Sequence, residues 1–149
     1  MKITGNKMAP NIFLAIATVI VVFAFSSCAT RAMFLQSAVV PAAKGKVIIK
    51  EDGNNNFAIK VNINNLAQSK NLQPAKNAYV VWMVTNDTIN TNIGQIVSST
   101  GAFSSKLKAS FETVSAFRPS KVFITAENEA DVLIPYSAIV ISTDFIGSK

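Results

Sequence analysis

Apolar residues recur with a period of two over much of this chain. The segments NFAIKVNIN (56–64) and SKLKASFET (105–113) carry an apolar side chain at every second position, with polar or small side chains between. Strict alternation of this kind predicts a strand with one buried face and one wet face. GKVIIKE (45–51) predicts a further strand, and Asp52-Gly53 directly after it is a strong hairpin signal.

Other segments are apolar on both faces, as expected of strands in the middle of a sheet or with a covered outer face. They are AYVVWMV (78–84), SKVFITA (120–126) and SAIVISTDF (137–145). Weaker strands are predicted in TNIGQIVS (91–98) and MFLQSAVV (33–40).

These strands predict an all-β fold. Beyond the N-terminal region no stretch sustains a helical period over three turns, and Pro74 favours a loop for residues 65–77. About seven or eight short strands, spaced about ten residues apart, indicate an antiparallel β-sandwich of the Ig-like type. A closed barrel is the alternative, but its strands should mostly alternate cleanly, and only some do here. We expect one domain without internal repeats.

The first 27 residues have the three-part layout of an export signal. Lys2 and Lys7 form a positive n-region, and the apolar stretch 9–25 is followed by small residues at Ser26 and Ser27. A membrane-spanning helix needs about 20 apolar residues. The run of residues 12–25 is shorter, so an uncleaved anchor is the less favoured alternative.

The tetrad FSSC, which ends at Cys28, resembles the lipobox of bacterial lipoproteins, although Phe25 replaces the more usual Leu. The resemblance implies cleavage before Cys28 and attachment of diacylglycerol to its thiol. The chain then divides into a signal peptide (1–27), a lipidated tether with a possible edge strand (28–44) and the sandwich (45–149). The resemblance also favours the outer membrane, because Ala29 is not the aspartate of inner-membrane retention. ATRAMF (29–34) lacks the acidic run of surface-export signals, which favours a periplasm-facing domain.

Charge and cysteine content exclude several classes of protein. Without the signal peptide, 12 of the 14 basic residues remain against 8 acidic ones, a net charge of +4. Lys and Arg form no long cluster in the sequence, which argues against nucleic acid as a partner and favours a solvated cationic surface. One cysteine cannot form an internal disulfide, so the stability of the domain must come from packing.

The sequence offers little catalytic chemistry. The chain has no histidine, which excludes Ser-His-Asp and Cys-His catalysis and the usual zinc sites. The acidic segment AENEAD (126–131) contains the best candidates for a metal site, a calcium ion held by Glu127, Glu129 and Asp131. The segment lacks the glycine and terminal glutamate of an EF-hand, so an ordinary solvated loop is favoured. We therefore expect no cofactor and no enzymatic activity.

Aromatic and hydroxyl side chains suggest two further features. Trp82 and Tyr79 lie in the most apolar segment of the mature chain and are predicted to fill the core. Tyr136 follows Pro135 in a loop and is the better candidate for an exposed aromatic. Asp87-Thr88-Ile89 resembles the acceptor pattern of protein O-glycosylation in Bacteroidetes, with Thr88 as the acceptor.

A wider resemblance covers residues 77–131. The aromatic strand with Tyr79 and Trp82, then Ile93-Gly94, then KVFITAE (121–127), resembles the extracytoplasmic sandwich of anti-sigma-K-type regulators and small lipoproteins of Bacteroidetes-type bacteria. Only about ten residues precede the apolar run, so the regulator's sigma-binding domain has no counterpart, and fold alone does not transfer function.

We expect a non-catalytic, outer-membrane lipoprotein that acts as a binding or structural module of the envelope, with an envelope protein or glycan as its partner. The alternatives are an accessory or sensory partner of a membrane regulator and, less favoured, a carboxylate-dependent hydrolase.

Overall fold

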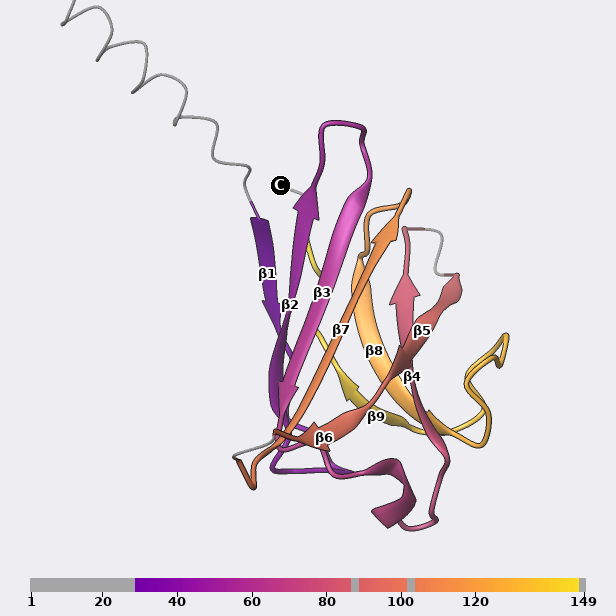
Figure 1. The fold of residues 1–149 in the computed structure, drawn as a ribbon. Helices are drawn as coiled ribbons and strands as arrows, with labels where there is room; N and C mark the ends of the chain where they lie inside the picture. The colour runs from indigo at the N-terminus through magenta and orange to yellow at the C-terminus, as the bar shows by residue number, and fades with distance from the viewer. Residues whose placement is uncertain (1–28, 87–88, 102–103, 148–149) are drawn as a thin grey trace, which may run out of the picture.

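The computed structural model describes residues 29–86, 89–101 and 104–147, and these form two antiparallel sheets packed face to face (Figure 1). One sheet has five strands in the order β1-β2-β3-β7-β6, and the other has four in the order β5-β4-β8-β9. The predicted antiparallel β-sandwich is therefore confirmed, with nine strands. The strands are β1 (Ala29–Met33), β2 (Lys44–Glu51), β3 (Phe57–Asn64), β4 (Ala78–Val84), β5 (Asn90–Ile96), β6 (Ser98–Thr100), β7 (Leu107–Ser115), β8 (Lys121–Glu127) and β9 (Ile139–Ser142), with a 3-10 turn η1 at Ser69–Asn71.

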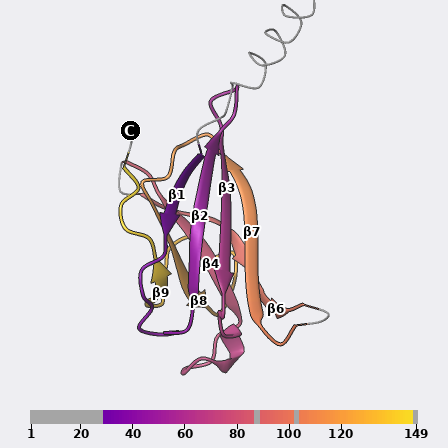
Figure 2. The same cartoon turned by 90° about the vertical axis from the view of Figure 1, so that its left-hand side faces the viewer.

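The strand order is that of an Ig-like sandwich with one strand added. Without β1, the sheets read β2-β3-β7-β6 and β5-β4-β8-β9. These orders match the A-B-E-D and C′-C-F-G sheets of the immunoglobulin fold. The extra strand β1 pairs antiparallel with β2 and extends the first sheet at its edge, as Figure 2 shows from the side of that sheet.

The core lies between the sheets and follows the alternation of the sequence. On β3, Ile59, Val61 and Ile63 are buried, while Lys60 and Asn64 face solvent. All seven residues of β4 are buried, and β8 is nearly as enclosed, as their apolar composition predicts. All nine strands pair within residues 29–147, so a chain that starts at Ala29 contains every strand and every core residue of the described structure.

Three predicted strands differ from the structure, and one of them, expected at 91–98, is divided at Val97 between β5 and β6. The strand expected at 33–40 is wrong: β1 ends at Met33, and the following residues form a loop. Ser37 explains the loop locally, because its hydroxyl accepts a bond from the amide of Val40 and donates one to the carbonyl of Val140. The strand expected at 137–145 is shorter, since β9 covers four residues at a sheet edge.

The two sheets are joined along both edges of the sandwich, by a short chain connection on one side and by a β-bridge on the other. The chain passes from β5 in one sheet to β6 in the other after a single residue, Val97. On the opposite side Phe34 forms a β-bridge with Thr143, and the amide of Leu35 donates to the carbonyl of Ser142. We call the end at which β1 begins the proximal end, and the opposite end, where β8 finishes, the distal end.

Candidate recognition site on the loop between β8 and β9

The loop of residues 128–138, here the β8–β9 loop, presents large apolar side chains to solvent. Leu133 is 85% exposed, Ile134 55% and Tyr136 74%. The exposure of Tyr136 agrees with the prediction from its position after Pro135. Scattered apolar side chains are normal on a protein surface, whereas several on one loop make that loop a candidate interaction site.

The side chain of Glu127, the last residue of β8, fixes the C-terminal half of this loop. Its Oε1 accepts hydrogen bonds from the amides of Tyr136 and Ser137, each 3.2 Å long. Its Oε2 accepts a bond from the Ser137 hydroxyl at 3.0 Å. The exposed Tyr136 therefore stands on a backbone that is tied to a rigid strand.

Asn92 on β5 fixes the first half of the loop. Its amide nitrogen donates to the carbonyls of Ala130 and Val132, both at 2.9 Å, while its carbonyl oxygen accepts from the amide of Gly94. Gly94 has a φ of 138° in the left-handed half of backbone space, beside a register irregularity in the β4–β5 pairing. One asparagine thus stabilises this irregularity and holds the loop against the sheet.

Beneath the loop is a second, smaller apolar cluster on the outer face of the four-stranded sheet. It consists of Val80, Trp82, Val84 and Phe123, with Val132 of the loop packed against it. Trp82 is fully buried in this cluster, so the prediction that it fills a core is confirmed, although this core lies under the loop and not between the two sheets. Its ring stacks on Phe123 with centroids 6.0 Å apart, and its Nε1 donates to the Thr125 hydroxyl at 2.8 Å.

The hydrogen bonds around Glu127 favour its charged form. Burial penalises the carboxylate, which belongs to a residue only 2% exposed. Hydrogen bonds from Thr125, from the amide and hydroxyl of Ser137 and from the amide of Tyr136 outweigh this penalty and hold the pKa of Glu127 below its ordinary value. Trp82, Thr125 and Glu127 form a continuous chain of hydrogen bonds from the buried cluster to the loop.

Tyr79, the other aromatic residue expected in the core, lies between the sheets. Its hydroxyl donates to the carbonyl of Ala67 at 2.8 Å, and burial raises the pKa of Tyr79 to about 12. The prediction that Tyr79 fills the core is therefore confirmed.

A shallow apolar groove of about 300 Å³ adjoins the base of the loop. It lies between the segment around Pro74 and the residues that lead into β9, and Ser137 belongs to both groove and loop. Its apolar walls come from Val39, Leu72, Pro74, Ala126, Ala138 and Val140. The groove and the loop therefore lie next to each other at the distal end.

The residues predicted from the sequence as site candidates fall in different places. Cys28 and Thr88 lie outside the described residues. Glu127 is buried and bonded to the loop backbone, whereas Glu129 and Asp131 belong to the β8–β9 loop. Within the described ranges, no three side chains of His, Cys, Asp or Glu come together as metal ligands. Leu133 and Ile134 were not singled out, although an apolar pair beside Pro135, outside any predicted strand, was the available signal.

No helix in the described part of the chain has the length and apolar character needed to cross a membrane. Comparison of the chain with family models, with curated proteins and with solved structures finds no match.

Proposed function

We propose that this protein is a non-catalytic binding lipoprotein of the bacterial outer membrane, held by a lipid on Cys28 and facing the periplasm. The observation that supports binding is the β8–β9 loop, which exposes Leu133, Ile134 and Tyr136 and whose backbone is held by the side chains of Glu127 and Asn92. A loop held this firmly loses little conformational entropy on binding, which favours recognition. The loop therefore has the properties of a preformed binding surface.

The two ends of the sandwich separate attachment from recognition. Ala29, the residue after Cys28, begins β1 at the proximal end, so a lipid on Cys28 would hold that end at the membrane. β8 runs for seven residues toward the distal end, which at about 3.4 Å per residue spans about 20 Å. The loop that follows β8 is therefore accessible to a partner in the periplasm.

The proposed partner is a protein with an apolar surface and a cationic rim. Aliphatic and aromatic side chains at the centre of a contact, with polar groups around them, are typical of protein interfaces. The exposed Glu129 and Asp131 directly precede the apolar residues, so the loop favours a basic partner. A glycan would require more hydrogen-bonding side chains than the exposed tip of this loop offers.

The contact between loop and partner can be tested by photocrosslinking in cells that produce the full chain. With benzoylphenylalanine in place of Tyr136, we expect one discrete protein adduct. It should disappear when Leu133→Ser is added, because the central apolar contact is lost. Identification of the adduct by mass spectrometry should show a protein with a basic, apolar surface, and a transmembrane regulator would support the accessory function instead.

Position 117 serves as the matched control, because Phe117 is also a large, exposed aromatic residue but lies on the β7–β8 connection at the proximal end. The same adduct from position 117 would contradict recognition by the loop. Adducts from position 136 that contain only glycan would contradict a protein partner. Unchanged fluorescence of Trp82 in the purified variants shows that the fold is intact.

Lipid attachment is tested separately by the Cys28→Ala variant in cells fed with an alkyne-bearing fatty acid. The wild-type chain should carry the label and sediment with membranes washed at high salt, which removes proteins held by charge alone, while the variant should lose both properties because it lacks the thiol. Two or three acyl chains anchor a protein far more firmly than one, so the loss from the membrane fraction should be nearly complete. A variant that still sediments with the salt-washed membranes would point to an uncleaved N-terminal helix as the anchor.

A further inference from the structure

The outer face of the five-stranded sheet gathers positive charge that is scattered in the sequence. We call the outward-facing positions of β1, β2, β3 and β7 the basic face. By strand register and alternation these positions are Ala29, Arg31, Met33, Lys44, Lys46, Ile48, Lys50, Ala58, Lys60, Asn62, Asn64, Lys108, Ser110, Glu112 and Val114. The face contains six cationic side chains, and Glu112 is the only carboxylate among these positions.

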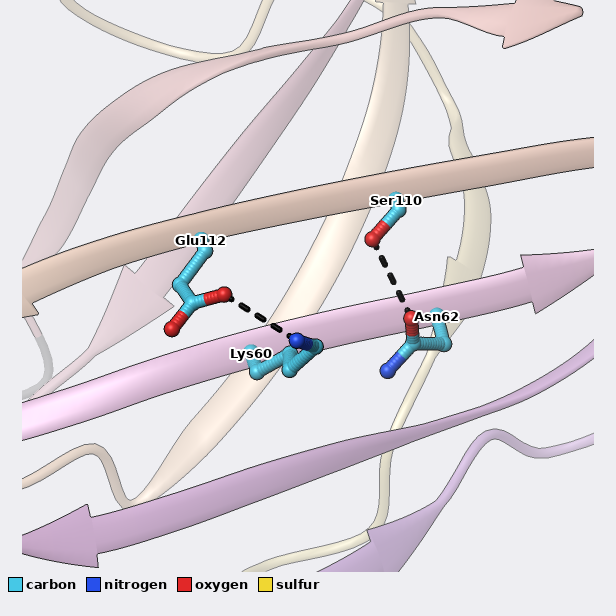
Figure 3. Close-up of polar contacts among 4 residues, drawn as sticks. All are labelled: Lys60, Asn62, Ser110 and Glu112. Carbon is cyan, nitrogen blue, oxygen red and sulfur yellow. Dashed lines mark hydrogen bonds and ion pairs between the residues drawn. The ribbon is translucent and has the colours of Figure 1, made fainter.

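The single acidic residue neutralises only part of this charge. Glu112 pairs with Lys60 across β3 and β7, with 3.1 Å between Nζ and Oε2 (Figure 3). In the next pair along these strands the Ser110 hydroxyl donates to the amide oxygen of Asn62 at 3.1 Å. The remaining cations, Arg31, Lys44, Lys46, Lys50 and Lys108, are all exposed.

These cations form a broad array on one surface. Lys44, Lys46 and Lys50 follow one another along β2, on which alternate residues are about 7 Å apart. Lys44 lies beside Asn64, which lies beside Lys108, with about 4.8 Å between neighbouring strands. Arg31 extends the array onto β1 at the sheet edge. The result is a flat cationic surface, several strands wide.

The basic face includes the point at which the proposed lipid would join the domain. Arg31 is three residues after Cys28, and Ala29, next to Cys28, belongs to the same face. The β8–β9 loop, with Glu129 and Asp131, lies instead over the outer face of the four-stranded sheet. The described residues therefore separate charge across the sandwich, with cations on one broad side and an acidic, apolar loop on the other.

We infer that the basic face lies against an anionic membrane surface. This orientation rests on the proposed attachment through Cys28, which would hold one edge of the face at the bilayer. Lys and Arg side chains near an anionic surface each contribute to adsorption, and their effect decreases beyond a Debye length. The β8–β9 loop then points away from the membrane, toward its partner.

The composition of the face favours a lipid surface over a soluble polymer. Its charges spread over two dimensions, whereas a linear polyanion requires a track or groove. The outward positions also include apolar Met33, Ile48 and Val114, which suit the boundary between headgroups and acyl chains. These positions hold no aromatic side chain on which a nucleic-acid base would stack.

The inference can be tested with the soluble chain that starts at Ala29, which contains all nine strands and carries no lipid. We expect it to sediment with phosphatidylcholine vesicles that contain about a third phosphatidylglycerol, and not with pure phosphatidylcholine vesicles. Each lost cation should reduce partitioning about fivefold, so Lys44→Gln, Lys46→Gln and Lys50→Gln together should reduce it about 100-fold. Added salt should reduce it as well.

A matched triple variant distinguishes an effect of the basic face on vesicle binding from an effect of net charge alone. Lys70→Gln, Lys76→Gln and Lys121→Gln remove the same charge from residues outside the face, and partitioning should change little. Equal losses in the two triple variants would overturn the inference, as would binding to dextran sulfate without binding to anionic vesicles. Because this chain lacks Cys28, a negative result leaves the lipidation proposal intact, and fatty-acid labelling tests that proposal independently.

Discussion

Replacing Trp82 with alanine is expected to lower the free energy of unfolding by about 3–5 kcal/mol. The indole is fully buried, stacks on Phe123 and donates a hydrogen bond to Thr125, so its removal leaves a cavity and a lost bond. Single domains are stable by only about 5–15 kcal/mol, so this loss is a large fraction of the total. Urea unfolding followed by circular dichroism measures the loss.

The Trp82→Phe variant is the control for this prediction. Phenylalanine retains an aromatic ring to stack on Phe123 but lacks the N–H group, so a smaller loss is expected than for alanine. If Trp82→Ala lowered the unfolding free energy by less than about 1 kcal/mol, the outer cluster would not contribute to the stability of the fold. The β8–β9 loop would then not act as the cover of a core.

The alternation of apolar residues predicted the sandwich because each strand has an inner and an outer face. It predicted β3 and β7 closely, because burial on one face alone makes alternation strict. It also showed that both faces of β4 are buried, but not what covers the outer one. The cover is the β8–β9 loop, and its position depends on Asn92, which is distant in the sequence and makes side-chain bonds that no periodicity shows.

The basic face and the role of Glu127 could not be predicted from the sequence for related reasons. Lys44 and Lys108 are far apart in the sequence and lie close together only because both pair with Asn64 on β3. Lys and Arg form no long run in the sequence, so the sequence alone indicates a diffuse positive charge. Glu127 was grouped with Glu129 as a loop carboxylate, since the sequence does not show that β8 continues to Glu127 and buries it.

Replacing Glu127 with glutamine is expected to lower the free energy of unfolding at neutral pH by about 2 kcal/mol. Glutamine keeps an acceptor for the amides of Tyr136 and Ser137 but loses the charge that strengthens these bonds. Because Glu127 is the last strand residue beneath the loop, the exchange should also accelerate hydrogen exchange at these two amides. Urea titrations and exchange measurements report the two effects separately.

The pH dependence distinguishes loss of charge from loss of shape. The pKa of Glu127 is lower in the folded chain than in the unfolded chain, so the folded state binds fewer protons and its stability decreases in acid. The wild type should have a higher free energy of unfolding than Glu127→Gln, and this difference should be complete above the ordinary glutamate pKa of about 4.3. It should disappear as the pH falls through the lower pKa of Glu127 in the folded chain. The pKa of Asp52 is also lowered, through its bonds to Asn56 and Asn54. Asp52 is present in both proteins, so its contribution to the pH dependence cancels when their free energies of unfolding are subtracted.

The fluorescence of Trp82 connects this result to the loop, because Trp82 is the only tryptophan and lies under Val132. If the carboxylate holds the loop closed, acrylamide should quench Trp82 more strongly in Glu127→Gln than in the wild type at neutral pH. In acid, but before global unfolding, acrylamide should quench Trp82 equally in the two proteins. A wild-type advantage that persisted unchanged to low pH would show that the shape of the side chain, and not its charge, keeps the loop in place.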